Sequence, residues 1–181
     1  MSGARIGALV GVFFGCAWGL AGAVGLPRSE RVIGVTLSLV ISVVLAILLA
    51  MHRTPGDTPP GVFRGGVYGA AVAFEVVAIF VAVLGLRHWE LEGLLVPTIG
   101  FIVGLHFIGL WKATDLIAFA WVAVAMCVVC LIAMALPGLA ADTGYAINFR
   151  QVVAGWGCAL VLWVAAATPL LTNVRITPTQ V

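Results

Sequence analysis

Charged side chains are scarce in this chain of 181 residues: Asp, Glu, Lys and Arg together make up 9% of it, and the net charge is +2. Soluble domains carry about a quarter charged residues, so the composition excludes a water-soluble protein. No block of like charge is present, which argues against nucleic-acid binding. No charge-rich or Ser/Gly-rich tail is left for a second domain, so residues 1–181 are predicted to form a single membrane domain.

Sequence motifs of the common enzyme classes are also missing. None of the four serines lies in a Gly-x-Ser-x-Gly element, and no aspartate lies within an apolar segment. A phosphate-binding glycine loop and an HExxH metal motif are absent from the sequence as well. We therefore do not expect an enzyme.

Histidine is too rare to predict a cofactor site. Only His106 lies deep within an apolar segment, whereas His52 and His88 lie at segment ends. Heme ligation by two intramembrane histidines is therefore not expected. Glu75 and His106 alone supply too few ligands for a metal site. We expect neither a cofactor nor a metal ion.

The four cysteines all lie in apolar segments, where the disulfide framework of a small secreted domain is not expected. The spacing Cys127-x-x-Cys130 leaves open a redox or metal-binding pair. Thiols buried in a valine-rich helix react poorly, however. A packing role as small apolar side chains is favoured for all four.

Six apolar segments dominate the chain, in which 63% of the residues are apolar and the mean hydropathy is +1.21. Each segment is long enough to cross about 30 Å of hydrocarbon. The sequence thus predicts an all-α, polytopic membrane protein with six transmembrane helices in one bundle. Asp115 is expected to cap the start of the fifth helix. The predicted spans are residues 6–26, 32–51, 65–86, 91–110, 116–136 and 151–171.

Basic residues are divided almost evenly between the two ends of the predicted bundle. With six spans, both termini lie on one side, which then holds five of the nine Lys and Arg residues. By the positive-inside rule this excess of one favours termini in the cytoplasm. The membrane itself is expected to be the bacterial cytoplasmic (inner) membrane. So small a bias is also typical of a protein that inserts in both orientations.

Two helix starts share a pattern that suggests an internal repeat. The motif FRxxVxG begins at Phe63, before the third span, and again at Phe149, before the sixth. Two related halves of three helices each would lie in opposite orientations, as in the inverted repeats of many transporters. A 3+3 inverted repeat and a chance match at two membrane interfaces both stay open, because few other residues match at the separation between Phe63 and Phe149.

Glycine recurs at every fourth residue of the first segment. Residues four apart lie one above another on a helix, so we expect a face without side chains. In a bilayer such a face lets another helix approach closely, within the chain or in a second copy of it. A similar face is expected on the fourth span. The glycines expected to pack helices are Gly7, Gly11, Gly15 and Gly19 on the first span and Gly100 and Gly104 on the fourth.

Glu75 lies near the middle of the third span, where an unpaired carboxylate costs several kcal/mol. Its helix face is otherwise small or polar and includes Arg64 and Tyr68, so this face is expected to point into the bundle or a hydrated cavity. Loss of water favours the protonated carboxyl group, which can then bind and release a proton or another cation. The alternative is a carboxyl group that only locks helices together.

His106 is the second ionisable residue inside a span. The fourth span ends on the side where the third begins, so we expect His106 to stand level with residues 68–71, one or two turns from Glu75. A Glu–His proton relay, or a hydrogen bond to Tyr68, becomes feasible if the two helices touch. A purely structural histidine is the alternative.

The element Gly104-Leu105-His106-Phe107, followed by Leu110-Trp111-Lys112, resembles small six-helix bacterial integral membrane proteins that carry a Gly-x-His-Phe element. The resemblance covers about one helix. It implies six spans and a role for His106, and it implies no activity. Ile108 and Gly109 stand where a proline would be expected nearby, so the match to the pattern is incomplete.

These residues predict a small transporter or channel subunit in which Glu75 responds to a proton or cation and His106, Tyr68 and Arg64 lie near it. A small molecule or ion would be its substrate, and the thin bundle is expected to self-associate. The alternative is a membrane partner that does not transport, such as a substrate-capturing subunit or a scaffold of a larger complex.

Overall fold

A computed structural model describes residues 3–51, 65–136 and 148–172, and every regular element in these ranges is helical. All six α-helices are long and apolar enough to cross a membrane. The predicted all-α fold with six spans is therefore confirmed, and the chain is a multi-pass membrane protein. The helices are α1 (Gly3–Val24), α2 (Arg28–Met51), α3 (Gly65–His88), α4 (Leu95–Thr114), α5 (Ile117–Ala135) and α6 (Phe149–Thr172), with a single 3-10 turn, η1 (Glu92–Leu94), before α4.

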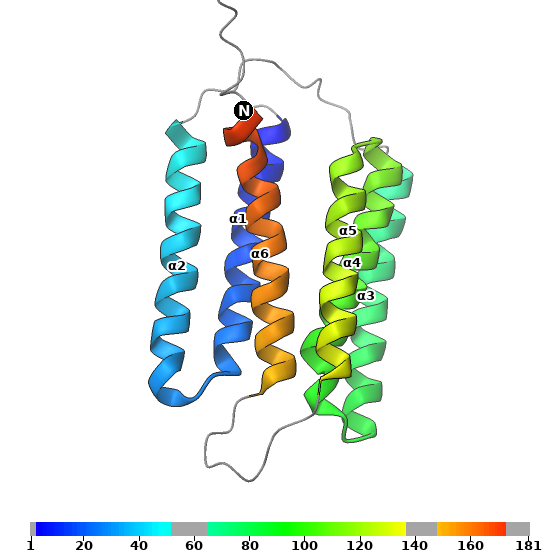
Figure 1. The fold of residues 1–181 in the computed structure, drawn as a ribbon. Coiled ribbons are helices and arrows are strands. Elements are labelled where there is room, and N and C mark those ends of the chain that lie inside the picture. The colour runs from blue at the N-terminus through cyan, green and yellow to red at the C-terminus, as the bar shows by residue number, and fades with distance from the viewer. Residues whose placement is uncertain (1–2, 52–64, 137–147, 173–181) are drawn as a thin grey trace, which may run out of the picture.

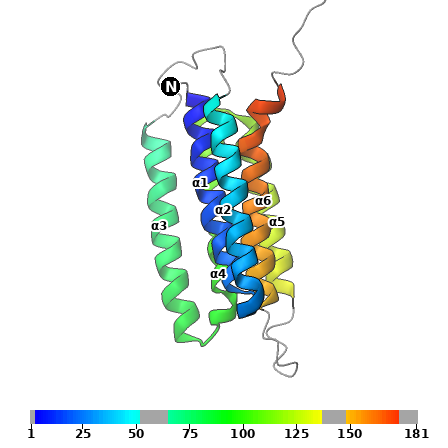
Figure 2. The same ribbon diagram turned by 90° about the vertical axis from the view of Figure 1, so that its left-hand side faces the viewer.

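The helices form two groups joined by α6. α1 packs along α2 and α6, whereas α4 packs along α3 and α5. Figure 1 shows α2, α1 and α6 on one side and α5, α4 and α3 on the other. α6 connects the groups through its contacts with α5 and α4. α2 and α3 are thus edge helices, and in Figure 2 α3 stands apart from α1 and α2.

The contacts of the two halves of the chain agree only in part. An inverted repeat of α1–α3 and α4–α6 would relate the contact between α5 and α6 to one between α2 and α3. α5 packs along α6, but α2 and α3 lie at opposite edges of the bundle (Figure 1). The contacts of α1 with α2 and α6 do correspond to those of α4 with α5 and α3, so the 3+3 repeat stays a prediction.

The main core lies where α1, α5 and α6 meet. Trp163 on α6 belongs to it and donates its indole N–H to Ser42 Oγ on α2, at 3.1 Å. A hydrogen bond between helices is favourable in a bilayer, because lipid tails offer no competing partner. The buried core residues are Trp18, Val122, Met126, Cys130, Cys158, Ala159, Leu162 and Trp163.

The glycine face of α1 is only partly a contact surface. A helix turns about 100° per residue, so a spacing of four drifts by about 40° at each step. Gly15 and Gly19 are buried, and a Cβ added to either would lie 2.6 Å from Trp163 or from Ser38 Oγ, respectively. Gly7 is exposed, and no described atom lies within 4 Å of an added Cβ. Within the described part of this chain Gly7 is therefore not a packing residue, and its packing against a second copy stays a prediction.

The tightest approach of α1 to α6 occurs at Gly22 and Gly155, which the sequence analysis did not single out for packing. A Cβ at Gly155 would fall on the Cα and N atoms of Gly22. Gly11 continues this contact, since its added Cβ would lie 3.4 Å from Ala166. We call this row the α1–α6 seam. Gly22 lies seven residues after Gly15, and that helical spacing could have identified it.

Gly100 and Gly104 on α4 face the cysteines of α5. A Cβ at Gly100 would lie 2.6 Å from Cys130 Sγ, and one at Gly104 would lie 2.8 Å from Cys127 Sγ. The fully buried thiols of Cys130 and Cys158 are 3.5 Å apart, share a hydrogen bond and form no disulfide, and the Cys127 thiol is directed at a carbonyl group of α4. The thiols thus fill the space between α4, α5 and α6.

Asp115 ends α4 and does not start α5. Its φ of 56° is left-handed, and its backbone N–H donates to the carbonyl oxygen of Trp111 at 2.7 Å. α5 begins after Leu116, which makes no side-chain cap. The prediction that Asp115 caps the fifth helix is wrong, because aspartate also tolerates the left-handed conformation that terminates a helix. α4 consequently extends to Thr114, one turn beyond its predicted end at Leu110.

Candidate functional site

The edge helix α3 presents Glu75 to its main neighbour. α3 packs along α4 and touches η1 near its C-terminal end, and none of residues 66–88 is buried. Its partly covered residues form an arc centred on Glu75, with Ala71, Ala78 and Ala82 on either side. These small side chains allow α4 to approach the carboxyl group closely.

His106 on α4 meets Glu75 across this contact. His106 Nδ1 lies 3.4 Å from Glu75 Oε2, and the two side chains are 10% and 23% exposed, respectively. This distance is within the range of an ion pair. The geometry is not that of a hydrogen bond, however, and the buried Nδ1 has no hydrogen-bond partner among the described residues. A small movement of either side chain would complete the bond.

Gly109 sets the spacing of the two helices beside the ionisable pair. A Cβ at Gly109 would lie 2.6 Å from the Cβ of Ala71. Gly109 lies one turn from His106, and Ala71 lies one turn from Glu75. We call the contact made by these four residues the α3–α4 seam. The sequence analysis did not select Gly109, although its spacing of three residues from His106 places both on one helix face.

The structure brings His106 closer to Glu75 than the sequence analysis predicted. His106 was expected level with residues 68–71, on the assumption that the fourth helix ends at Leu110. Because α4 continues to Thr114, His106 lies one turn deeper and reaches Glu75 directly. The predicted offset of one or two turns is therefore wrong.

The other two predicted site residues are Tyr68 and Arg64. Tyr68 lies two turns before Glu75 on α3, and 41% of it is exposed. Arg64 lies outside the residues that the structure describes. A role for either residue in the site stays a prediction.

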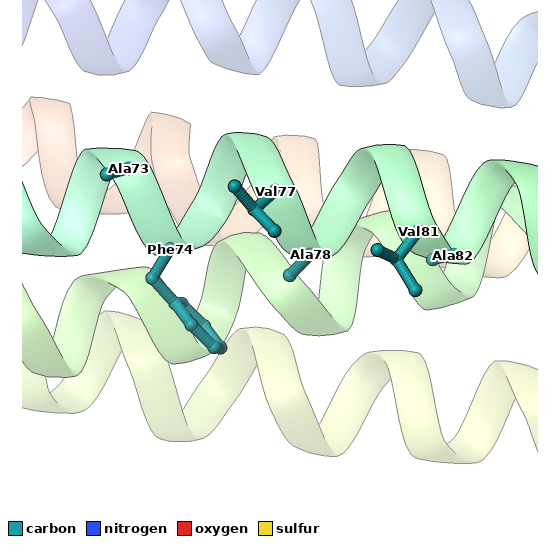
Figure 3. A pocket seen from close by; sticks show the side chains of 6 residues that line it. All are labelled: Ala73, Phe74, Val77, Ala78, Val81 and Ala82. Carbon is teal, nitrogen blue, oxygen red and sulfur yellow. The ribbon is translucent and has the colours of Figure 1, made fainter.

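A shallow apolar depression lies on α3 itself. Figure 3 shows that all six of its lining side chains come from this helix, and neither Glu75 nor His106 is among them. An aliphatic and aromatic surface of this kind suits the acyl chains of lipid. The lining residues are Ala73, Phe74, Val77, Ala78, Val81 and Ala82.

The chemistry available at the α3–α4 seam is that of one carboxyl group and one imidazole. In the described ranges, no group of three or more His, Cys, Asp or Glu side chains comes together as a metal site would require. The expectation of no metal and no cofactor stays a prediction. A carboxylate and an imidazole in contact can share a proton, and the carboxylate can attract a cation.

Comparisons of this chain with models of protein families, with curated proteins and with solved structures find no match. A functional assignment therefore has to be argued from the residues of the site and their geometry.

Proposed function

We propose that this chain is a small, non-enzymatic membrane transporter or channel subunit in which Glu75 responds to a proton or another cation. The main observation in support is the distance of 3.4 Å between Glu75 Oε2 and His106 Nδ1 inside an apolar bundle. Ionisable side chains are costly inside a membrane, and those that occur there commonly mark ion or proton pathways. We place the chain in a bacterial inner membrane, and the small excess of Lys and Arg on the side of the termini supports cytoplasmic termini.

The incomplete pairing of the site supports a role beyond helix locking. A carboxyl group that served only to lock helices would be expected to have its hydrogen bonds completed by the protein. Here 23% of the Glu75 side chain is exposed, and the buried Nδ1 of His106 has no hydrogen-bond partner in the described part of the chain. A proton or ion that comes and goes accounts for both features.

A membrane partner that does not transport is the second candidate, and the exposure of α3 favours it. Phe74, Val77 and Phe80 are each more than half exposed on this edge helix. A helix held mainly by one neighbour can accept a helix from another chain, whether a second copy or a different subunit. In that case the charge of Glu75 would not matter for function.

Glu75→Gln in reconstituted vesicles separates the two candidates. The substitution keeps the shape of the side chain but removes its titration, so we expect proton flux under an imposed pH gradient to fall to the background of empty vesicles. A pH-sensitive dye trapped inside the vesicles measures this flux. Glu90→Gln, in the exposed turn after α3, is the matched control and should retain the wild-type flux. Equal flux in the wild type and Glu75→Gln would reject the transport proposal.

A further inference from the structure

The side chains available at the α3–α4 seam indicate which ion Glu75 binds. This inference rests on the proposed function and concerns the same site. Hard metal cations take many oxygen ligands, about six to eight for Ca²⁺, and K⁺ filters replace the hydration shell with rings of carbonyl oxygens. Glu75 and His106 offer one carboxylate and one imidazole nitrogen, without a third ionisable ligand in the described ranges. A proton needs only these two groups.

We propose that the ion is a proton shared between Glu75 and His106, and that this proton fastens the edge helix α3 to α4. With one proton, the pair is either carboxylate with imidazolium or carboxylic acid with imidazole, and both forms are neutral overall. Removal of the proton leaves a carboxylate beside a neutral ring. Addition of a second proton leaves an imidazolium beside a neutral acid. Either change puts a net charge into an apolar seam, which is costly.

The packing of α3 makes it the element that this charge would move. In a bilayer, lipid tails are as apolar as the helix surface, so helices are held together by close packing and polar contacts. No residue of α3 between 66 and 88 is buried, and the main contacts of this helix are with α4 and η1. Its close approach at Ala71 and Gly109 lies one turn from the ionisable pair. Separation of Glu75 from His106 would thus loosen the contact at its centre.

Among the residues that the structure describes, the other titratable and charged groups of the surrounding elements lie on other helical turns or other elements than the pair. On α3 and α4 they occupy other turns or the helix ends, η1 lies at the membrane edge, and the cysteines of α5 and α6 face the opposite side of α4. The pair therefore controls the charge at the centre of the seam. These groups are Tyr68, Arg87 and His88 on α3, Glu90 and Glu92 at η1, Lys112 and Asp115 at the end of α4, Cys127 and Cys130 on α5, and Arg150 and Cys158 on α6.

Spin labels that report the position of α3 test this proposal in bilayers. The labels are attached through Val81→Cys on α3 and Ile33→Cys on α2, both exposed positions, after Cys16 and Cys127 are replaced by alanine. Distances are measured from about pH 4 to about pH 9, where glutamate and histidine side chains ordinarily take up protons. We expect a narrow distribution when the pair holds one proton and a longer or broader one on either side. Labels at Ile33→Cys and Val124→Cys on α5 are the control and should not respond.

Variants of the pair and a second ion complete the experiment. Glu75→Gln should abolish the loosening of α3 at high pH, because no carboxylate remains, and His106→Gln should abolish the loosening at low pH, because no imidazolium remains. The double variant should show no pH response. Na⁺ added at constant pH should change nothing. A wild-type distance that is constant across this range, a response that persists in the double variant, or a response to Na⁺ would each overturn the proposal. If protons are transported but the position of α3 does not change with pH, the proposal that the proton holds α3 to α4 is rejected and the transport proposal stands. If α3 responds to pH but no proton flux is found, the transport proposal is rejected instead.

Discussion

Gly155→Ala is expected to destabilise the bundle strongly, and Gly7→Ala is expected to leave it unchanged. A Cβ at Gly155 would fall on the Cα and N atoms of Gly22 and lie 2.9 Å from the carbonyl oxygen of Trp18. These are backbone atoms that cannot rotate away, so α1 and α6 would have to separate. Overpacking of this kind costs about 1–3 kcal/mol and occasionally more.

Gly7, on α1, is the control for a glycine outside the close contact between α1 and α6. No described atom lies within 4 Å of a Cβ added there, so alanine meets no obstacle. Thermal unfolding of both variants in detergent, followed by circular dichroism, measures the difference. We expect a lower midpoint for Gly155→Ala and a midpoint at or slightly above the wild type for Gly7→Ala, since alanine is the better helix former. Equal midpoints would contradict the α1–α6 seam.

His106→Leu is expected to cost more stability than the double substitution Glu75→Leu with His106→Leu. The single change leaves the carboxyl group facing an apolar side chain across the α3–α4 seam. A buried polar group deprived of its partner costs about 1–3 kcal/mol. Replacement of both partners by apolar side chains can be nearly neutral, because no unpaired group remains.

Unfolding in mixed micelles, titrated with a denaturing detergent, gives the free energy of each variant for this comparison. His88→Leu, at the exposed end of α3, is the control and should change stability by less than about 0.5 kcal/mol. A single and a double variant that lose the same stability would show that Glu75 and His106 do not interact.

The number and length of the helices could be predicted from hydropathy, because a bilayer admits only structures that satisfy their own backbone hydrogen bonds. The presence of Glu75 and His106 inside two of these spans could be read in the same way. Their contact could not, since it depends on the end of α4. The left-handed conformation of Asp115 fixes that end, and aspartate suits a helix start equally well.

The residues that each glycine contacts could not be predicted from local sequence patterns. The four-residue repeat of α1 correctly indicated close packing at Gly15 and Gly19, but the rotation of the helix carries Gly7 away from the contact. The tightest contact joins Gly22 to Gly155, in the first and the last helix. Pairing between helices so far apart in the chain is decided by the packing of the whole bundle, which no single segment encodes.

Solid-state NMR of the protein in bilayers tests the shared proton most directly. Isotope labels in the glutamate carboxyl carbons and the histidine ring nitrogens follow both members of the pair as pH changes, and Glu75→Gln and His106→Gln assign their signals. Because interacting groups titrate together, the account predicts that the Glu75 and His106 signals change over the same pH steps. A Glu75 carboxyl group that takes up its proton while the His106 ring nitrogens stay unchanged would contradict it.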